Sequence, residues 1–591
     1  MCGFAGEFTT GRAPDREAVE RMAATMADRG PDGSGAWADG PVALAHRRLK
    51  VIDLSSTGDQ PMVDYENGMT IVFNGCIYNH RELRARLERE GYNFFSTSDT
   101  EVILKAHDHW GHRCAELFAG MFAYVLYEHY SGRLFLVRDR LGIKPLYLAD
   151  VGDSLRFAST LPALLAGGGV DTELDPVALH HYFTWHAGVP APRTMLAGVQ
   201  KLAPATVMIV SPDGQRHSEN YWRAHYTRHP RFADWAREDW SEAILDALRT
   251  AVERRMVSDV PVGVLLSGGL DSSLIVALLA EGGQRGLATF SVGFDGVGDD
   301  EGDEFAFSDL IAKQFETDHH QIHVPEEGLL ESLDGAIGAM SEPMVSHDAV
   351  AFYLLAQEVA HSHKVVQSGQ GADEVFAGYF WYPPLLDAAG SGEEDYVAAF
   401  FDRPHTDMAK ILQPRYQLEE DASRAFLDWH FRQPGAETPI DRALRFDTEV
   451  LLPEHPVMRL DNMSMAWGLE SRTPFLDHEL VELAAACPSE LKLADGGKGV
   501  LKAASRGVVS DAVIDRPKAY FPVPAFYNLE GATLDLIRDT LDESAIEERG
   551  LFRLEYIQQL VATPSEHMTT LGGSTLWHIA LLELWLHRHG L

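Results

Sequence analysis

The loop Ser267-Gly-Gly-Leu-Asp-Ser-Ser273, together with the segments on either side of it, predicts the fold of the larger part of this chain. It follows a short apolar run, residues 262–266, that predicts a buried strand. It precedes residues 274–280, which predict a helix that ends at two glycines. Residues 287–294 predict the next strand. The order strand, loop, helix, strand indicates a βαβ unit with a parallel sheet.

The loop itself has the composition of an anion-binding site. Its backbone N–H groups and the helix N-terminus can bind phosphate, and Gly268 and Gly269 let the backbone approach closely. Asp271 offers oxygen ligands of the kind that Mg²⁺ prefers. Further donors are the hydroxyl groups of Ser267, Ser272 and Ser273. A plain Gly-Ser turn is the alternative, and the chain has no Walker-type Gly-x-x-x-x-Gly-Lys-Ser/Thr string.

The chain upstream of this unit mixes strands and helices. Buried strands are predicted over residues 69–73, 121–127 and 134–137. Amphipathic helices are predicted over residues 15–28 and 81–90. The mixture predicts an α+β domain of layered type.

Composition shifts divide the chain into three parts. We predict a first domain over 1–205, a polar and aromatic junction over 206–240, and a second domain over 241–591. Beyond about residue 390 the second domain is expected to be mainly helical, and residues 293–304 to form an acidic, glycine-rich loop.

Cys2 directly follows the initiator methionine. Once Met1 is removed, Cys2 carries a thiol and an α-amine whose ordinary pKa is roughly 7.7–8.0, so the amine can act as the base for the thiol on the same residue. Such a thiol could attack an amide carbonyl and release ammonia. A cysteine at position 2 is usually incidental, so the position alone does not assign this role.

The bulk composition narrows the class of protein. The chain has 591 residues and a net charge of −38, which disfavours binding to nucleic acid or to anionic membranes. Four cysteines form neither a disulfide framework nor a zinc-site spacing, which fits a reducing cytoplasm. The N-terminus lacks the pattern of a signal peptide, and no apolar run reaches the roughly 20 residues of a transmembrane helix.

Five short motifs in the first domain resemble class II glutamine amidotransferases, which have an N-terminal-nucleophile (Ntn) hydrolase fold with four αββα layers. The motifs are Met1-Cys-Gly-Phe-Ala-Gly6, Arg29-Gly-Pro-Asp-Gly33, His46-Arg-Arg-Leu-Lys-Val-Ile-Asp53, Phe73-Asn-Gly-Cys-Ile-Tyr-Asn79 and Ser98-Asp-Thr-Glu101. The resemblance implies that Cys2 is the nucleophile and that Asn74 and Gly75 form the oxyanion hole. It also implies that Arg48 binds the α-carboxylate of glutamine and Asp99 its ammonium. Further glutamine contacts are expected from Leu49, Val51, Ile52 and Cys76.

Position 76 departs from the motif of asparagine synthetases, which usually have glutamate there. One carboxylate near the glutamine ammonium is therefore missing, and Asp99 remains. We expect glutamine binding to survive, and we favour a packing role for Cys76 over a catalytic one.

The second domain resembles the PP-loop ATP pyrophosphatases in the asparagine synthetase arrangement. Besides the Ser267 loop, the matching motifs are Thr289-Phe-Ser-Val-Gly293, Ser368-Gly-Gln-Gly-Ala-Asp-Glu374 and Met463-Ser-Met-Ala-Trp-Gly-Leu-Glu-Ser-Arg-Thr-Pro-Phe-Leu-Asp477. The resemblance implies ATP and Mg²⁺ as cofactors, with Asp271 and Asp373 on the metal and Lys518 stabilising charge during adenylation. The ATP-binding residues that it implies are Leu265, Ser267, Gly268, Gly269, Asp271, Ser272, Ser273, Val292, Ser368 and Gly369.

The acceptor of the amide group is the open question. Asparagine synthetases have a glutamate by the acyl intermediate where this chain has Gln370, and a neutral residue suits an acceptor without a free α-amine. The motifs around Asn74, Met340–Asp348 and Phe380-Trp-Tyr-Pro-Pro384 are similar to the N-acetylglutaminylglutamine amidotransferases, which make an osmoprotectant. We therefore expect small-molecule substrates, and a homodimer is the oligomer we consider.

Three alternatives stay open beside this interpretation. Asparagine synthesis from aspartate is the first. A non-catalytic module that senses glutamine or ATP is the second, suggested by Cys76 and Gln370. Transfer of ammonia to a phosphoribosyl group is the third, and the Ser267 loop argues against it.

Overall fold

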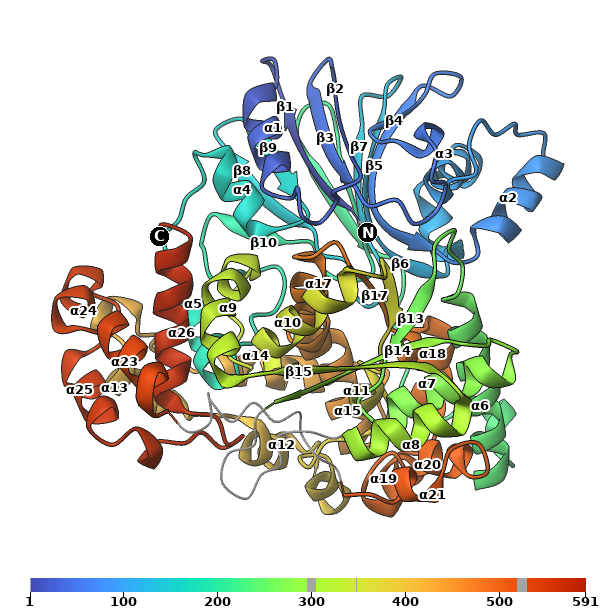
Figure 1. The fold of residues 1–591 in the computed structure, drawn as a ribbon. Helices are drawn as coiled ribbons and strands as arrows, with labels where there is room; N and C mark the ends of the chain where they lie inside the picture. Colours follow the sequence, from blue (N-terminus) through green and yellow to red (C-terminus); the bar gives the residue numbers. More distant parts are fainter. Residues whose placement is uncertain (1, 295–304, 347, 389, 518–528) are drawn as a thin grey trace.

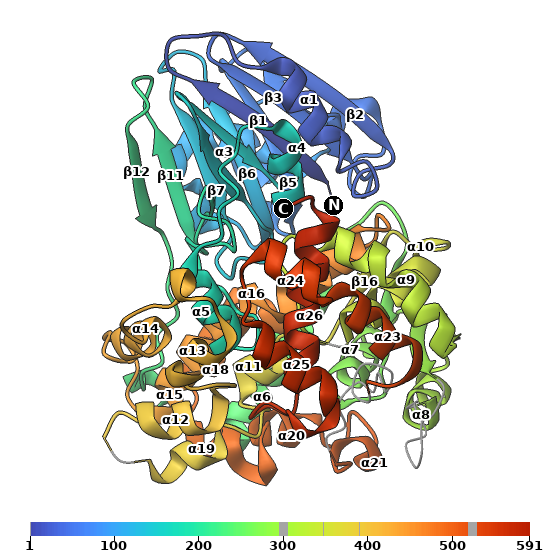
Figure 2. The ribbon, with the colours of Figure 1, turned by 90° about the vertical axis from the view of Figure 1, so that its left-hand side faces the viewer.

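The computed structural model describes residues 2–294, 305–346, 348–388, 390–517 and 529–591. Figure 1 shows an N-terminal part with two sheets above a C-terminal part that is built around a third sheet. In both views the N-terminus lies where the two parts meet (Figures 1 and 2). The start of the chain is therefore placed against the other part of the molecule.

The first sheet is antiparallel and has β1 near its centre. Its order is β10 (Val199–Lys201), β8 (Tyr147–Val151), β9 (Ser154–Ala158), β1 (Gly3–Thr9), β3 (Val42–Arg48) and β2 (Gly33–Asp39). Every residue of β1 is buried, and its side chains are apolar or small except for Glu7, which pairs with Arg12 and Arg156. Cys2 stands directly before this buried strand.

The second sheet is also antiparallel. Its order is β12 (Arg216–Asn220), β11 (Thr206–Val210), β7 (Leu134–Arg138), β6 (Gly120–Glu128), β5 (Met69–Ile77) and β4 (Met62–Asp64). The strands predicted over residues 69–73, 121–127 and 134–137 are confirmed. β11 and β12 belong to this sheet, although their residues fall within the stretch 206–240 that we assigned to a junction.

Helices pack on the outer faces of the two sheets. α1 (Arg16–Ala24) and α4 (Leu161–Gly167) contact the first sheet, whereas α3 (Asp99–Trp110) contacts the second and carries α2 (His80–Arg89). Asp15 caps α1 by accepting a hydrogen bond from the backbone of Ala18. The helix predicted over 15–28 is confirmed with shorter limits, and the helix predicted over 81–90 is confirmed with a shift of one residue.

The third sheet is parallel. Its order is β15 (Asp318–Val324), β14 (Ala288–Phe294), β13 (Val262–Leu265), β16 (Val365–Gln367) and β17 (Glu470–Arg472). α7 (Leu270–Glu281) follows β13 after the Ser267 loop, as predicted. The chain places β14 on one side of β13 and β16 on the other, and ligands of such sheets bind outside the strand ends at this point of reversal.

The remaining helices lie between residue 176 and the C-terminal end. They make up most of the chain after residue 390, as predicted. They are α5 (Pro176–Thr184), α6 (Arg237–Arg254), α8 (Phe305–Phe315), α9 (Glu326–Ala339), α10 (Asp348–Ala360), α11 (Ala372–Phe376), α12 (Glu393–Phe400), α13 (Met408–Ile411), α14 (Ala422–Phe431), α15 (Pro439–Phe446), α16 (Leu452–Glu454), α17 (Pro456–Met465), α18 (His478–Ala486), α19 (Ser489–Leu493), α20 (Gly499–Ser505), α21 (Asp511–Ile514), α23 (Gly531–Thr540), α24 (Glu543–Arg549), α25 (Leu554–Ala562) and α26 (Thr575–Arg588). Residues 295–304 of the predicted acidic loop lie outside the described residues.

A buried group of charges joins the two parts of the molecule. Asp461 of α17 lies 2.9 Å from Arg29 and 3.0 Å from Lys144, and all three side chains are buried. Burial alone would raise the pKa of Asp461, but the two cations outweigh it and lower that pKa. Losing one partner would leave a buried charge uncompensated, so this contact fixes how the two parts meet.

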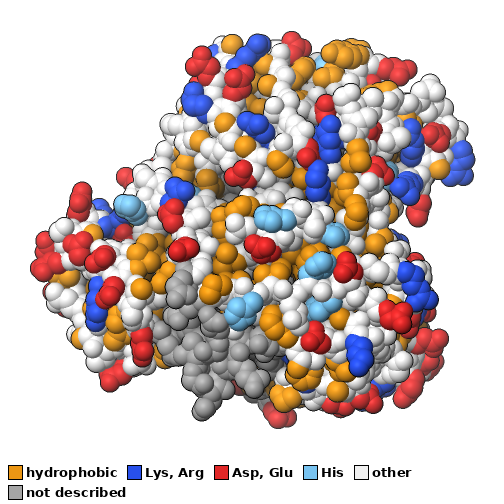
Figure 3. Space-filling model, in the orientation of Figure 1, with side chains coloured by type: hydrophobic (Ala, Val, Ile, Leu, Met, Phe, Trp, Pro, Cys, Tyr) orange, Lys and Arg blue, Asp and Glu red, His pale blue; other side chains and the backbone are white. Residues whose placement is uncertain are grey.

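The surface agrees with the acidic composition. On the face drawn in Figure 3, acidic side chains are scattered across the C-terminal part. Within the described ranges, none of the helices has both the length and the apolar character that a bilayer crossing requires.

Candidate active sites

Cys2 lies in a pocket between the two parts of the molecule. The pocket has about 370 Å³ of empty space and is lined by most of the predicted glutamine-site residues. These are Cys2, Arg48, Leu49, Val51, Ile52, Gly75, Cys76 and Asp99. Burial raises the pKa of the Cys2 thiol, so the thiol itself is neutral near pH 7 and needs a base to become a nucleophile.

Asn74 and Gly75 stand next to Cys2 on β5. The side-chain oxygen of Asn74 accepts a hydrogen bond of 3.0 Å from the Cys2 backbone. Its amide nitrogen is buried and has no hydrogen-bond partner within the described residues. A side chain at Gly75 would overlap β6, since an added Cβ would lie 2.7 Å from the Cα of Phe122. The buried amide group of Asn74 is therefore a hydrogen-bond donor without a partner among the described residues, next to the Cys2 thiol. An oxyanion site requires such a donor.

Arg48 is held by the loop that follows β3. Its guanidinium donates to the carbonyl groups of Ser55 and Asp53 and lies 2.6 Å from the carboxylate of Asp59. A side chain at Gly58 would collide with this guanidinium. The loop therefore fixes Arg48 at the pocket wall, where it can meet a carboxylate.

Asp99 and Cys76 line the same pocket. Asp99 begins α3, and its carboxylate accepts a hydrogen bond of 3.0 Å from the backbone of Ile77. Burial raises the pKa of Asp99, and a bound ammonium would offset this effect. The Cys76 sulfur lies 3.8 Å from the guanidinium of Arg472, and burial raises the pKa of its thiol. Cys76 therefore packs as a neutral side chain.

Two lining residues with long polar side chains, Glu470 and Gln60, were not among the predicted glutamine contacts. Glu470 of β17 lines the pocket from the C-terminal part and pairs with Arg472 at 2.7 Å. Gln60 lines it as well and accepts a hydrogen bond of 2.6 Å from the backbone of Phe73. Neither lies in a motif that we connected with glutamine, so only the tertiary structure reveals them.

The second pocket lies at the carboxyl ends of three adjacent parallel strands. β14 contributes Val292, β13 leads into the Ser267 loop, and β16 leads into Ser368. The empty space of about 1880 Å³ includes the solvent at the open mouth of the pocket. The predicted residues that line it are Leu265, Ser267, Gly269, Asp271, Ser272, Val292, Ser368, Gly369, Gln370 and Asp373.

Two predicted ATP-site residues are not part of this lining. Ser273 is fully buried in α7. Gly268 is buried too, with a backbone φ of +72°, and an added Cβ would lie 2.6 Å from the backbone nitrogen of Ser308. The glycine there is required by the turn and by the neighbouring helix.

Asp271 and Asp373 converge on one cation, Lys498. The ammonium group of Lys498 lies 2.7 Å from Asp271 and 2.9 Å from Asp373. Burial alone would lower the pKa of Lys498, but the two carboxylates outweigh it and raise that pKa. Lys498 was not among the predicted site residues, because no motif around it marks an active site.

The same two carboxylates fit a magnesium site. Their oxygens are close enough to share one positive centre, and Mg²⁺ is typically held by one or two carboxylates together with substrate phosphates. Lys518 lies outside the described residues. Other cationic side chains in the pocket lining belong to Lys498, Lys502, Arg459 and Arg516.

One pair of strands connects the two pockets. β16 and β17 are adjacent in the third sheet, with Gln367 opposite Arg472. Glu470 of β17 lines the first pocket, whereas Ser368, directly after β16, lines the second. The backbone N–H of Ser368 donates to the carbonyl of Arg472 at 2.8 Å. The two sites therefore lie at opposite ends of the same strand pair.

Comparisons with known families cover almost all of the chain. Residues 1–222 match the family described as glutamine amidotransferase domain, and residues 243–587 match the family described as asparagine synthase. The first match contains Cys2, Arg48, Asn74 and Asp99, and the second contains the Ser267 loop.

Individual relatives extend the match over both parts. The glutamine-hydrolysing asparagine synthetase 1 of Bacillus subtilis (strain 168) is 31% identical over 99% of this chain and 96% of its own length. The asparagine synthetase 3 of the same organism is 31% identical over 88% of this chain and 87% of its own. A solved structure of the glutamine phosphoribosylpyrophosphate amidotransferase of B. subtilis aligns with 56% of this chain and 92% of its own, at 16% identity and a TM-score of 0.31.

Proposed function

Since the chain belongs to the asparagine synthase family and is a glutamine-hydrolysing amidotransferase, we propose that it amidates the C-terminal carboxylate of N-acetylglutaminylglutamine. The ammonia comes from glutamine at Cys2, and ATP activates the carboxylate. The observation that carries the choice of acceptor is the neutral Gln370 in the lining of the second pocket.

The first half of the reaction needs only residues of the first pocket and Asn74, which contacts Cys2 next to it. After removal of Met1, the α-amine of Cys2 takes the proton of its thiol, and the sulfur attacks the amide carbonyl of glutamine. The unpaired amide N–H of Asn74 and the backbone N–H of Gly75 donate to the oxyanion. Arg48 and Asp99 hold the two charged groups at the α-carbon. The C–N bond breaks, ammonia leaves with the proton, and water releases glutamate from the thioester.

The second half takes place beside Asp271 and Asp373. An oxygen of the acceptor carboxylate attacks the α-phosphorus of ATP, and the bond to the β-phosphate breaks to release pyrophosphate. Bound Mg²⁺, held by the two aspartates, would neutralise phosphate charge. Lys498 holds both carboxylates in place, and the Ser267 loop offers backbone donors to the phosphates. Ammonia then attacks the acyl carbon, and AMP leaves.

The same strand pair borders both sites. Glu470 of β17 lines the first pocket, and Ser368, directly after β16, lines the second. We propose an enclosed passage along this strand pair, because ammonia released into water near pH 7 would be protonated and lose its nucleophilicity.

The proposed acceptor follows from the neutral side chain at position 370 and from the opening of the second pocket to solvent. A dipeptide with an acetylated amine brings no ammonium group, so a glutamate at position 370 would find no partner, whereas Gln370 can donate and accept hydrogen bonds. The second pocket opens to solvent, so an acceptor can reach it from outside. Aspartate remains the second candidate, because curated relatives at 31% identity are named asparagine synthetases.

One assay separates these acceptors. The purified chain is incubated with glutamine, Mg·ATP and either the acetylated dipeptide, aspartate or no acceptor, and pyrophosphate is measured. We expect release above the acceptor-free rate with the dipeptide alone. Release with aspartate alone would assign the chain to asparagine synthesis, and no release with any acceptor would favour the sensing module.

The proposal has three further parts. We propose the PP-loop type for the second domain and four αββα layers for the first, in line with the two sheets and their outer helices. We also propose a cytoplasmic location, which suits four free and buried cysteines. A homodimer is proposed as well, and sedimentation of the purified chain tests it.

A further inference from the structure

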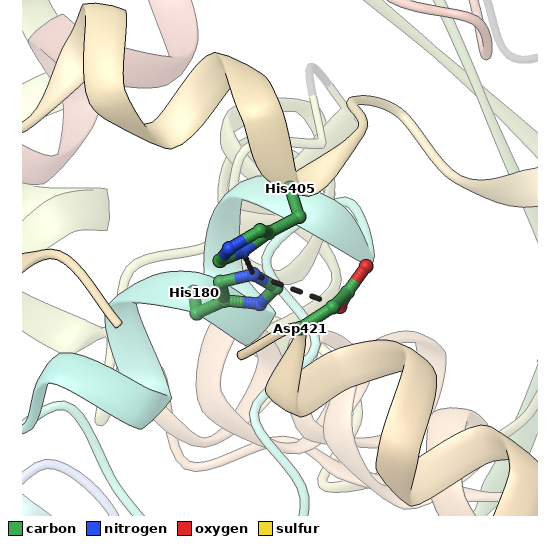
Figure 4. A group of neighbouring side chains, drawn as sticks. All are labelled: His180, His405 and Asp421. Atoms are coloured by element: carbon green, nitrogen blue, oxygen red, sulfur yellow. Dashed lines mark hydrogen bonds and ion pairs between the residues drawn. The ribbon is translucent and has the colours of Figure 1, made fainter. Parts of the chain in front are cut away.

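Three side chains from distant segments meet away from both pockets (Figure 4). His180 belongs to α5, His405 begins a short 3-10 turn (His405–Asp407), and Asp421 is the N-cap of α14. Their potential ligand atoms all lie within 4.8 Å of one another. The Nε2 atom of His180 is 2.9 Å from Nδ1 of His405 and 3.7 Å from Oδ1 of Asp421.

We propose that His180, His405 and Asp421 bind one divalent transition-metal ion, with Zn²⁺ as the expected metal. Zinc bonds of about 2.0–2.1 Å in a tetrahedron put neighbouring donor atoms about 3.3 Å apart. The two measured separations lie on either side of that value, so small side-chain rotations bring the donors around an ion. Two imidazoles with one carboxylate suit Zn²⁺, whereas Mg²⁺ and Ca²⁺ prefer oxygen ligands alone.

A second contact orients the buried imidazole. Nδ1 of His180 lies 2.7 Å from the hydroxyl of Ser423, and both residues are buried. With the proton on Nδ1 donated to Ser423, the lone pair of Nε2 points to His405 and Asp421. Metal-binding histidines are commonly held through their other nitrogen in this way.

The site is accessible and its surroundings are acidic. His405 and Asp421 are partly exposed, so an ion can reach them from solvent. Glu419 and Glu420 precede Asp421 and are exposed, which favours the approach of a cation. Because α5 and α14 pack together and His405 comes from a third segment, a bound ion would tie three segments into one unit.

The competing explanation is a metal-free hydrogen-bond chain through the same histidines. A metal titration distinguishes the two explanations. The full chain without an affinity tag is stripped with EDTA and dialysed. It is then titrated with Co²⁺ in the presence of excess Mg²⁺, which occupies sites made of oxygen ligands only. The visible d–d absorption reports imidazole ligation, and Zn²⁺ should displace Co²⁺. His405→Gln removes one ligand, and Asp421→Asn removes another while keeping an N-cap acceptor. His217→Gln, at an exposed histidine of β12, is the control.

We expect one equivalent of Co²⁺ in the wild type and in His217→Gln. Both ligand variants should bind at least about 100-fold more weakly. Zn²⁺ should raise the unfolding temperature of the wild type and of the control but not of His405→Gln. A wild type without a one-equivalent site, or ligand variants that bind Co²⁺ as tightly as the wild type, would overturn the proposal in favour of the metal-free chain.

Discussion

Asn74 accepts a hydrogen bond of 3.0 Å from the backbone of Cys2 through its side-chain oxygen, and its amide nitrogen is buried without a partner in the described part of the chain. One side chain thus positions the nucleophile and keeps a donor for the reaction. This dual contact connects the fold to the chemistry, because Asn74 lies on the second sheet and Cys2 precedes the first.

Replacing Asn74 with alanine should affect turnover more than binding. We expect the kcat of glutamine hydrolysis to fall about 100- to 1000-fold, because one oxyanion donor is lost, with a smaller change in KM. Steady-state glutamate release measures both constants. A rise in KM at unchanged kcat would instead place Asn74 in ground-state binding.

Replacing Cys2 with alanine should separate the two half-reactions. Glutamine-dependent synthesis should fall by at least about 1000-fold, while synthesis with added ammonium salts continues, because the second pocket is intact. Cys114→Ala, at a buried cysteine packed against Tyr124, is the matched control and should keep both activities. Loss of the ammonia-dependent reaction in Cys2→Ala would contradict two separate sites.

Replacing Lys498 with methionine should make the stability of the protein depend on Mg²⁺. Asp271 and Asp373 would then repel each other without a cation, which we expect to cost about 1–3 kcal/mol of unfolding free energy, discounted for their partial exposure. Urea unfolding with and without Mg²⁺ measures this. Lys502→Met is the control from the same pocket, and an equal Mg²⁺ response in both variants and the wild type would refute the prediction.

Replacing Gln370 with glutamate should shift acceptor preference towards aspartate. A new carboxylate in the second pocket can pair with the ammonium of aspartate but not with an acetylated amine. We expect the ratio of kcat/KM values, dipeptide over aspartate, to fall about tenfold, a change of about 1.4 kcal/mol. An unchanged ratio would show that position 370 does not meet the acceptor.

Asp447 gives a pH-dependent term in stability. Burial raises its pKa from 3.8 to about 6, although hydrogen bonds from Tyr382, Tyr396 and Trp381 oppose the shift. The folded state therefore holds a proton that the unfolded state releases, and stability from this group is lost as pH rises from about 4 to 6. The loss over that range is about 3 kcal/mol.

The asparagine in Asp447→Asn cannot titrate. The unfolding free energy of this variant, relative to that of the wild type, should therefore rise by about 3 kcal/mol between pH 4 and pH 6. Asp213→Asn, at an exposed turn, is the control and should run parallel to the wild type. Urea unfolding at several pH values measures the difference. Parallel curves for Asp447→Asn and the wild type would show that folding does not raise the pKa of Asp447.

Local motifs predicted much of the fold, and many of the predicted site residues line one of the two pockets. The strand before Ser267 and the helix after it follow from apolar runs and glycines, and parallel strands bring their carboxyl-end loops together. Asp271 and Asp373 belong to two motifs that each follow a strand of the parallel sheet. The rule for such loops therefore predicted that the two carboxylates serve one site. Each prediction depended on residues close in sequence or on a general rule of sheet topology.

Contacts between distant segments could not be predicted. Lys498 meets Asp271 across 227 residues of chain, and no local pattern marks it. Glu470 reaches the glutamine pocket only because β17 lies at the sheet edge that faces the N-terminal part. The predicted junction over 206–240 contains β11 and β12 because backbone pairing with β7, rather than composition, decides where a sheet ends.

The decisive measurement follows ¹⁵N from the amide group of glutamine into the amide group of the product. The chain is supplied with Mg·ATP, glutamine carrying ¹⁵N in its amide group, and equal amounts of the acetylated dipeptide and aspartate, and the products are separated by mass spectrometry. We predict ¹⁵N in the new C-terminal amide of the dipeptide, with AMP formed in equal amount and aspartate unchanged. Labelled asparagine beside an unchanged dipeptide would contradict the proposed acceptor, and label found only in free ammonia would contradict the transfer itself.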